Sequence, residues 1–148
     1  MQQTNQNDSQ TNIELRLRTL LILWIAMLMS FVGLYVLTIV TRRPHDVTPN
    51  PVLSLVLLCI GLLITVLSFP VKNRLLSKAV AQQQIEKVQQ AYIVAWALTD
   101  VAALLGILDF FLANHAHYYI LLIIAVIGTL LHFPRRETVE NAAFKRTI

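Results

Sequence analysis

Four apolar runs, separated by short polar or proline-containing stretches, dominate the pattern of this chain. They cover residues 19–40, 52–69, 92–113 and 118–133. A bilayer core about 30 Å thick requires about 20 mostly apolar residues in a helix that rises about 1.5 Å per residue. The first three runs approach or exceed that length, and the fourth is shorter. The pattern therefore predicts an all-α, four-helix transmembrane bundle over residues 19–133.

The stretches outside these runs predict the rest of the organisation. Residues 1–18 are polar and are expected to form a disordered tail. Residues 71–90 lack Pro and Gly and favour helix, so they predict a cytoplasmic connector that is either solvated or lies on an anionic lipid surface. Pro70 and Pro134 are expected to end the second and fourth spans. Residues 134–148 predict a charged cytoplasmic tail.

The second and fourth spans resemble each other. Leu57–Lys72 aligns without gaps on Leu121–Arg136, with seven of sixteen positions identical. The identities include Thr65 with Thr129 and the terminal Phe-Pro pairs. Two tandem helical hairpins that arose by duplication would explain this match. The match could equally be a coincidence, since both spans are apolar and both end in a Phe-Pro pair that disfavours further helix.

The third span carries a carboxylate, Asp100, close to its midpoint. A charged side chain at that depth is costly, so Asp100 is expected to face protein or water rather than lipid. One reading is a neutral acid that is hydrogen-bonded to a neighbouring helix. The other is a reversible proton or ion site. The candidate hydrogen-bond partners at compatible depths are Ser30, Cys59, Thr65 and Thr129.

A second carboxylate, Asp109, lies nine residues further along the same span. Nine residues place it half a turn out of phase with Asp100, which argues against a two-carboxylate acid–base site. Asp109 is instead expected to pair with the first hairpin, and the candidate partners there are Tyr35, Thr38, Arg42 and Arg43. His115 and His117 follow in the outer loop, but two histidines without a fixed third ligand do not predict a metal site.

One face of the third span consists of small residues. At 100° per residue, Ala95, Thr99, Ala102 and Gly106 fall within about 40° of one line. Small residues at this spacing let a neighbouring helix backbone approach closely. The face therefore predicts a helix-packing surface. His132, at the end of the fourth span, is expected to lie at the headgroup level.

Charge gives the predicted orientation. The chain is 56% apolar and 14% charged, with 12 basic and 8 acidic residues. Ten Lys and Arg residues flank the spans on the side of the termini, and two flank them on the other side. The positive-inside rule then predicts that both termini are cytoplasmic, and it explains the basic residues without a nucleic-acid partner.

A family resemblance rests on the third span. The run Ala97-Leu98-Thr99-Asp100-Val101-Ala102-Ala103, with Gly106 and the Phe-Pro ends, resembles a group of small, uncharacterised bacterial four-helix membrane proteins that show Ala-Leu-x-Glu-x-x-Ala. It is also loosely similar to the duplicated-hairpin proteolipids of rotary ATPases, in which a mid-membrane acid binds the transported ion. In those proteins the acid lies on the second helix of a hairpin, whereas Asp100 lies on the first.

These features together lead to one functional expectation and one alternative. We expect a non-enzymatic integral protein of the bacterial inner membrane that forms a homo-oligomer or joins other membrane subunits. It would be a structural or accessory subunit, surrounded by lipid and without a cofactor, a metal or a nucleic-acid partner. The alternative, which the resemblance to proteolipids implies, is a proton or cation conductor that uses Asp100.

Overall fold

A computed structural model describes residues 2–41, 50–113 and 118–143. All regular structure in these residues is helical. The elements are α1 (Gln2–Val40), α2 (Pro51–Ala81), α3 (Ile85–Leu108), the π-helical turn η1 (Asp109–Ala113), α4 (Tyr119–Leu131) and α5 (Arg136–Ala143). The all-helical prediction is thus confirmed for the part of the chain that the structure describes.

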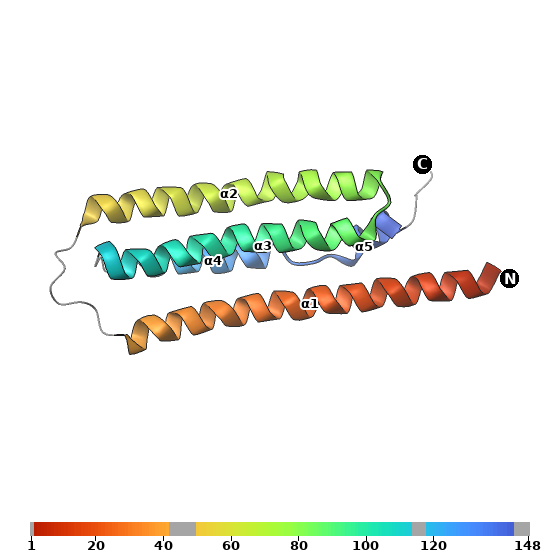
Figure 1. Ribbon diagram of the computed structural model, residues 1–148, viewed down its shortest axis with the longest axis horizontal. Coiled ribbons are helices and arrows are strands. Elements are labelled where there is room, and N and C mark those ends of the chain that lie inside the picture. Colours follow the sequence, from red (N-terminus) through yellow and green to blue (C-terminus); the bar gives the residue numbers. More distant parts are fainter. Residues whose placement is uncertain (1, 42–49, 114–117, 144–148) are drawn as a thin grey trace.

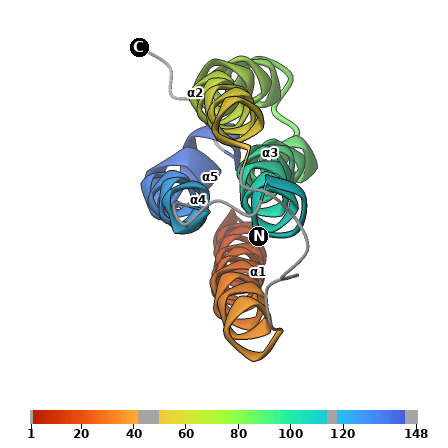
Figure 2. The same cartoon turned by 90° about the vertical axis from the view of Figure 1, so that its left-hand side faces the viewer.

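Helix α3 is the centre of the bundle. It packs antiparallel against α2 in the most extensive helix–helix contact and lies between α2 and α1, with α4 beside it (Figures 1 and 2). Helix α1 makes fewer contacts and lies to one side of α3 and α4, opposite α2 (Figure 2). The start of α1, the turn between α2 and α3, and α5 share one end of the molecule (Figure 1). We call this the basic end, because Lys72, Lys78 and Arg135 are among the residues there.

Three helices are long and apolar enough to cross a membrane by length and composition. The corresponding segments are Ile13–Val40, Pro51–Ala81 and Glu86–Leu112. Helix α4 is apolar too, but it has only 13 residues. Large apolar side chains cover the outside of the helices; Met29 of α1, for example, is 63% exposed and Leu55 of α2 is 61% exposed. Such continuous apolar surface is typical of a protein that is surrounded by lipid.

The second helix does not stop at Pro70, so that prediction is wrong. Helix α2 runs through Pro70 and ends at Ala81. A proline inside a helix removes one backbone hydrogen bond and costs about 3 kcal/mol. Packing offsets this cost, because Ala79, nine residues further on, is fully buried in a cluster with Val88 and Tyr92 of α3.

The predicted connector 71–90 is also not one segment. The chain turns at Gln82–Gln84, where Gln83 adopts a left-handed φ of 52°, and α3 begins at Ile85. The Gln84 N–H donates to the carbonyl of Ala79 at 3.1 Å, which satisfies one of the last carbonyls of α2. Residues 71–90 therefore form the adjacent ends of two antiparallel helices.

The polar N-terminal segment differs from the disordered tail expected over residues 1–18. Helix α1 begins at Gln2, and Ile13 is buried together with Leu20. Both pack in a cluster with Val88 of α3 and Val139 of α5. The three- and four-residue spacing of Ile13, Leu17 and Leu20 gives α1 an apolar stripe there, and the stripe needs its tertiary partners to become buried. The C-terminal segment likewise contains a helix, α5.

Candidate functional site

Buried polar side chains from the helices meet at one place in the bundle, toward the basic end. We call this group the polar cluster. It consists of Trp24, Thr65, Ser68, Trp96, Thr99, Thr129 and His132, which come from α1, α2, α3 and the end of α4. All of these except the partly buried Trp24 have little or no solvent exposure.

The shortest contact between side chains in the cluster joins Ser68 and His132. The Ser68 hydroxyl donates to the carbonyl of Thr65 at 2.6 Å, and its oxygen lies 2.7 Å from Nε2 of His132. A serine hydroxyl has one proton, so Nε2 of His132 must carry the hydrogen of this second bond. Nδ1 is then an unprotonated acceptor, and it is buried without a partner among the described residues.

A serine next to a histidine also occurs in hydrolases, but the geometry here differs. In a nucleophilic pair the base takes the serine proton, and a third group orients the base through its other nitrogen. Here Nε2 of His132 donates to Ser68, Nδ1 has no such partner in the described chain, and both side chains are 0% exposed. In the described chain the pair is therefore a buried link between α2 and the end of α4.

Three threonines form the next layer of the cluster. Thr99 donates to the carbonyl of Trp96 at 2.8 Å, so the 2.9 Å contact between the Thr99 and Thr129 hydroxyls has Thr129 as the donor. Gly128 lies between the threonines of two helices. A Cβ added there would meet Cγ2 of Thr99 at 2.8 Å and Cγ2 of Thr65 at 2.9 Å. At this point α2, α3 and α4 are as close as their backbones and side chains permit.

The two tryptophans satisfy carbonyls at the end of α4. Trp24 Nε1 of α1 donates to the carbonyl of Thr129 at 3.0 Å, and Trp96 Nε1 of α3 donates to that of His132 at 3.3 Å. The last carbonyls of a helix have no partner within the helix, and buried ones need donors from elsewhere. Each indole thus caps α4 and links it to another helix.

A hydroxyl and an aromatic ring extend the cluster toward the basic end. The hydroxyl of Tyr92 accepts from the backbone N–H of Arg135 at 3.3 Å. The ammonium of Lys72 lies 5.5 Å from the centre of the same ring, within the range of a cation–π contact. Tyr92 thereby holds α2, α3 and the segment after α4 together.

Asp100 lies outside the cluster. Its side chain is half-buried, and Oδ1 is buried without a hydrogen-bond partner in the described part of the chain. Of the four candidate partners, Ser30 and Cys59 are exposed. The other two bond elsewhere, because the Thr65 hydroxyl donates to the carbonyl of Gly61 at 2.9 Å and Thr129 bonds Thr99.

Asp109 begins the π-helical turn η1 and is 2% exposed. Its Oδ1 has no hydrogen-bond partner among the residues that the structure describes. The hydroxyl of Thr38, a proposed partner, donates to the carbonyl of Tyr35 at 2.7 Å instead. Two other proposed partners, Arg42 and Arg43, lie outside the described residues, as do His115 and His117. Within the described ranges, no group of three His, Cys, Asp or Glu residues could hold a metal ion.

The small residues of α3 are buried. Ala95, Thr99 and Ala102 are each 0% exposed. A Cβ added at Gly106 would come within 3.1 Å of Cβ of Leu121 and 3.2 Å of the carbonyl oxygen of Tyr118. Gly106 thus lies against the start of α4, and Thr99 lies against its end.

The sequence did not single out three members of the cluster, Trp24, Ser68 and Trp96. It placed a fourth, His132, at the headgroup level, whereas the structure buries this side chain within the protein. A signal for two of them was present, because Ser68 and His132 occupy equivalent positions when residues 57–72 and 121–136 are aligned. Two spans with the same direction, both packed on α3, bring equivalent positions to the same depth. The two tryptophans carried no comparable signal, since their role depends on where α4 ends.

Comparisons with known proteins add no relative to this picture. No protein-family model matches the sequence, no curated protein matches it, and no solved structure matches the fold. The resemblance to four-helix bacterial membrane proteins therefore stays a prediction.

Proposed function

We propose that this chain is a four-span integral membrane protein and that it serves as a non-enzymatic structural or accessory subunit. It would pack with further copies of itself or with other membrane subunits. The observation that carries this proposal is the state of Asp100, whose buried Oδ1 has no donor within the described chain. A polar group in apolar surroundings costs several kcal/mol unless it is hydrogen-bonded. The side chain of Asp100 is only half-buried, so its accessible part could bond to a donor from an adjacent subunit, which would reduce that cost.

The packing of α4 supports a fourth span. Its 13 residues cover about 20 Å, which is short of a bilayer core of about 30 Å. Residues 132–135 continue without regular structure and add up to about 13 Å. Non-helical backbone is tolerated at membrane depth only where protein buries it. His132 and Pro134 are buried, which supports a span made of α4 together with these residues.

The distribution of basic residues supports a bacterial inner membrane location with both termini in the cytoplasm. Labelling with a membrane-impermeant thiol reagent tests this topology. In a Cys59→Ser background, Lys78→Cys should be labelled only after the membrane is opened, and Arg43→Cys should be labelled in intact cells. Labelling of both positions from the same side would contradict the four-span topology.

Association is tested through Asp100. Asp100→Leu removes the group that needs a partner, so the size of the complex in mild detergent should fall toward that of a monomer. Asp100→Asn keeps hydrogen-bonding capacity and should keep the complex. Leu104→Ala, one turn away on the same helix, is the matched control. A parent protein that is monomeric at all concentrations and co-purifies with no other membrane protein would refute the subunit role.

A second candidate is a proton or cation conductor that uses Asp100. The same observation favours it, because a carboxyl oxygen without a permanent partner in the described chain is available to take part in proton or ion exchange. Flux into vesicles that contain the purified protein separates the two functions. Conduction requires that Asp100→Asn abolish the flux while the complex stays intact. A structural role requires that the parent show no flux above that of empty vesicles.

A further inference from the structure

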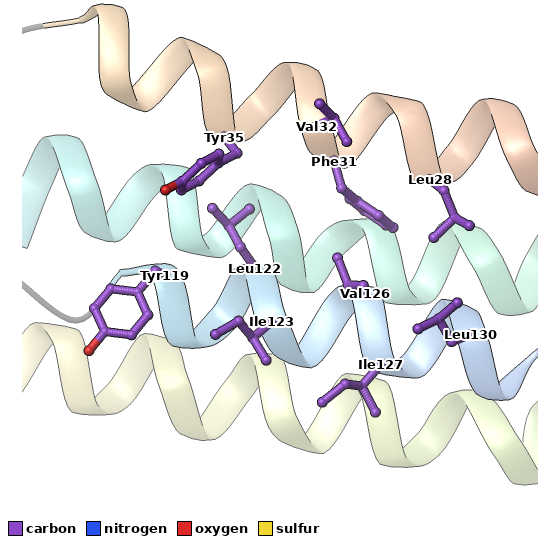
Figure 3. A pocket seen from close by; sticks show the side chains of 10 residues that line it. All are labelled: Leu28, Phe31, Val32, Tyr35, Tyr119, Leu122, Ile123, Val126, Ile127 and Leu130. Atoms are coloured by element: carbon purple, nitrogen blue, oxygen red, sulfur yellow. The ribbon is translucent and has the colours of Figure 1, made fainter.

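A long apolar groove lies between α1 and α4. It has a volume of about 670 Å³, and Figure 3 shows the side chains of α1 and α4 that line it. The lining residues are Leu28, Phe31, Val32, Tyr35, Tyr119, Leu122, Ile123, Val126, Ile127 and Leu130. Only two of these side chains carry a polar atom, Tyr35 and Tyr119, and both lie at the end of the groove opposite the basic end (Figure 3). The rest of the lining is hydrocarbon.

At its other end the lining of the groove stops at Leu28 and Leu130. Just beyond these residues the rings of Trp24 and Phe133 meet edge to face, with their centres 5.1 Å apart. Trp24 Nε1 also donates to the carbonyl of Thr129. Phe133 also lines a second pocket further toward the basic end, together with Leu17 and Arg135. The ring contact thus lies between the two pockets, and we take it as the closed end of the groove, which makes the groove a blind slot along the seam between α1 and α4.

The length of the slot matches one leaflet of a bilayer. From Tyr119 to Leu130 the α4 wall extends over twelve residues, which rise by about 16 Å along the helix. Half of a hydrocarbon core of about 30 Å is about 15 Å. The tyrosine end then lies where amphipathic aromatic rings are enriched, at the boundary between hydrocarbon and headgroups. The closed end lies near the middle of the membrane.

We propose that this groove binds one acyl chain of a phospholipid from the leaflet at its tyrosine end. The chain would enter beside Tyr35 and Tyr119 and end against Trp24. The inference requires that α1 and α4 lie in the bilayer, but it does not depend on the subunit role of the protein.

A helix from a second copy fits the groove less well, for two reasons. A membrane-spanning helix continues across both leaflets, whereas the contact of Trp24 with Phe133 blocks the seam halfway. Helix packing in membranes also uses small residues that let backbones approach. The lining contains no Gly, Ala or Ser, and the exposed Gly33, which has no atom within 4 Å of an added Cβ, does not line the groove. An acyl chain needs neither a continuous seam nor a small-residue face.

Photo-cross-linking tests the proposal on the full-length protein in phosphatidylcholine vesicles. The probe is a phosphatidylcholine with a diazirine near the methyl end of one acyl chain, and peptide mass spectrometry locates the label. We expect the label to concentrate on Leu28, Val126 and Leu130, at the closed end of the groove. Labelling spread evenly over the exposed faces of all helices, including Leu63 of α2, would overturn the proposal. A cross-link between two copies through the groove would overturn it as well.

A pair of variants provides the control. Ile123→Trp fills the groove, and it should reduce labelling of Leu28 and Leu130 to the level of the outer face of α2. Leu55→Trp introduces the same side chain at an exposed site of α2, also four residues after the start of its helix, and should leave the labelling of the groove unchanged. If Ile123→Trp folds and the groove labels as strongly as in the parent, the chain does not lie there. If it does not fold, the distribution of label on the parent decides alone.

Discussion

The close approach of three helices at Gly128 makes Gly128→Ala a sensitive test of the packing. Its new Cβ would lie 2.8 Å from Cγ2 of Thr99 and 2.9 Å from Cγ2 of Thr65, whereas carbon atoms in contact prefer about 3.5–4.0 Å. Both threonines are β-branched, and their hydroxyls bond the carbonyls of Trp96 and Gly61. Neither can therefore rotate away without losing a hydrogen bond.

The magnitude follows from two opposing contributions. Overpacking a well-filled interior costs about 1–3 kcal/mol, and replacing Gly by Ala in a helix gains up to about 1 kcal/mol. Gly128→Ala should thus lower the free energy of unfolding by about 0–2 kcal/mol. Gly33→Ala is the matched control, because nothing lies within 4 Å of its added Cβ and only the helical gain remains. The difference between these two variants, about 1–3 kcal/mol, isolates the packing contribution.

Reversible unfolding in mixed micelles, with the parent alongside, would measure this difference. Combining Gly128→Ala with Thr65→Ser and Thr99→Ser removes both methyl groups and keeps both hydroxyls. The combined variant should lose less stability than the sum of the losses measured for the separate changes, and a mutant cycle detects this difference. Equal stability of Gly128→Ala and Gly33→Ala would refute the close packing. A combined variant whose loss of stability equals the sum of the separate losses would also refute it.

Three further changes have expected outcomes in the same unfolding assay. Trp24→Phe removes the N–H that donates to the carbonyl of Thr129, so it should lower the free energy of unfolding by about 0.5–1.5 kcal/mol. A variant as stable as the parent would mean that the indole does not cap α4. Pro70→Ala restores an N–H that can bond the carbonyl of Val66, so it should stabilise the protein by about 1 kcal/mol or more. A loss of stability would mean that the proline is needed for packing. Gly61→Ala should cost less than Gly128→Ala, because the one close contact of its Cβ, at 2.5 Å, would be with the flexible end of Leu121, and its other neighbours lie at 3.7 Å. The reverse order would contradict the assigned contacts.

The sequence predicted the helices well and their ends poorly. Apolar length alone indicates which segments can cross a bilayer, and the structure has three such helices and a shorter fourth. The continuation of α2 past Pro70 depends on contacts of Ala79 with α3, which no local pattern contains. The early start of the packed part of α1 depends in the same way on Val139, more than a hundred residues away. Local signals mark where a helix is able to end, and tertiary contacts decide whether it does.

The candidate site was predicted in part, and for a related reason. The sequence singled out Thr65 and Thr129 as polar groups inside the spans, but it paired them with Asp100. The structure joins Thr129 to Thr99 and leaves Oδ1 of Asp100 without a donor in the described chain. Depth along a span can be counted from the sequence. The side of a helix that faces a given neighbour depends on the packing of all helices together.

The short length of α4 explains why the polar cluster lies where it does. A helix of about 20 Å that starts near one surface of a 30 Å core ends well inside it. Its last carbonyls therefore cannot reach water and must find donors within the protein. Trp24 and Trp96 provide two of these donors, and the backbone N–H of His132 bonds the carbonyl of Gly128 at 3.2 Å. A fourth span of full length would leave these indoles without their acceptors. The short span and the two tryptophans thus depend on each other. Lengthening α4 by one turn of leucines before His132 should therefore destabilise the bundle, even though the change makes the span more apolar.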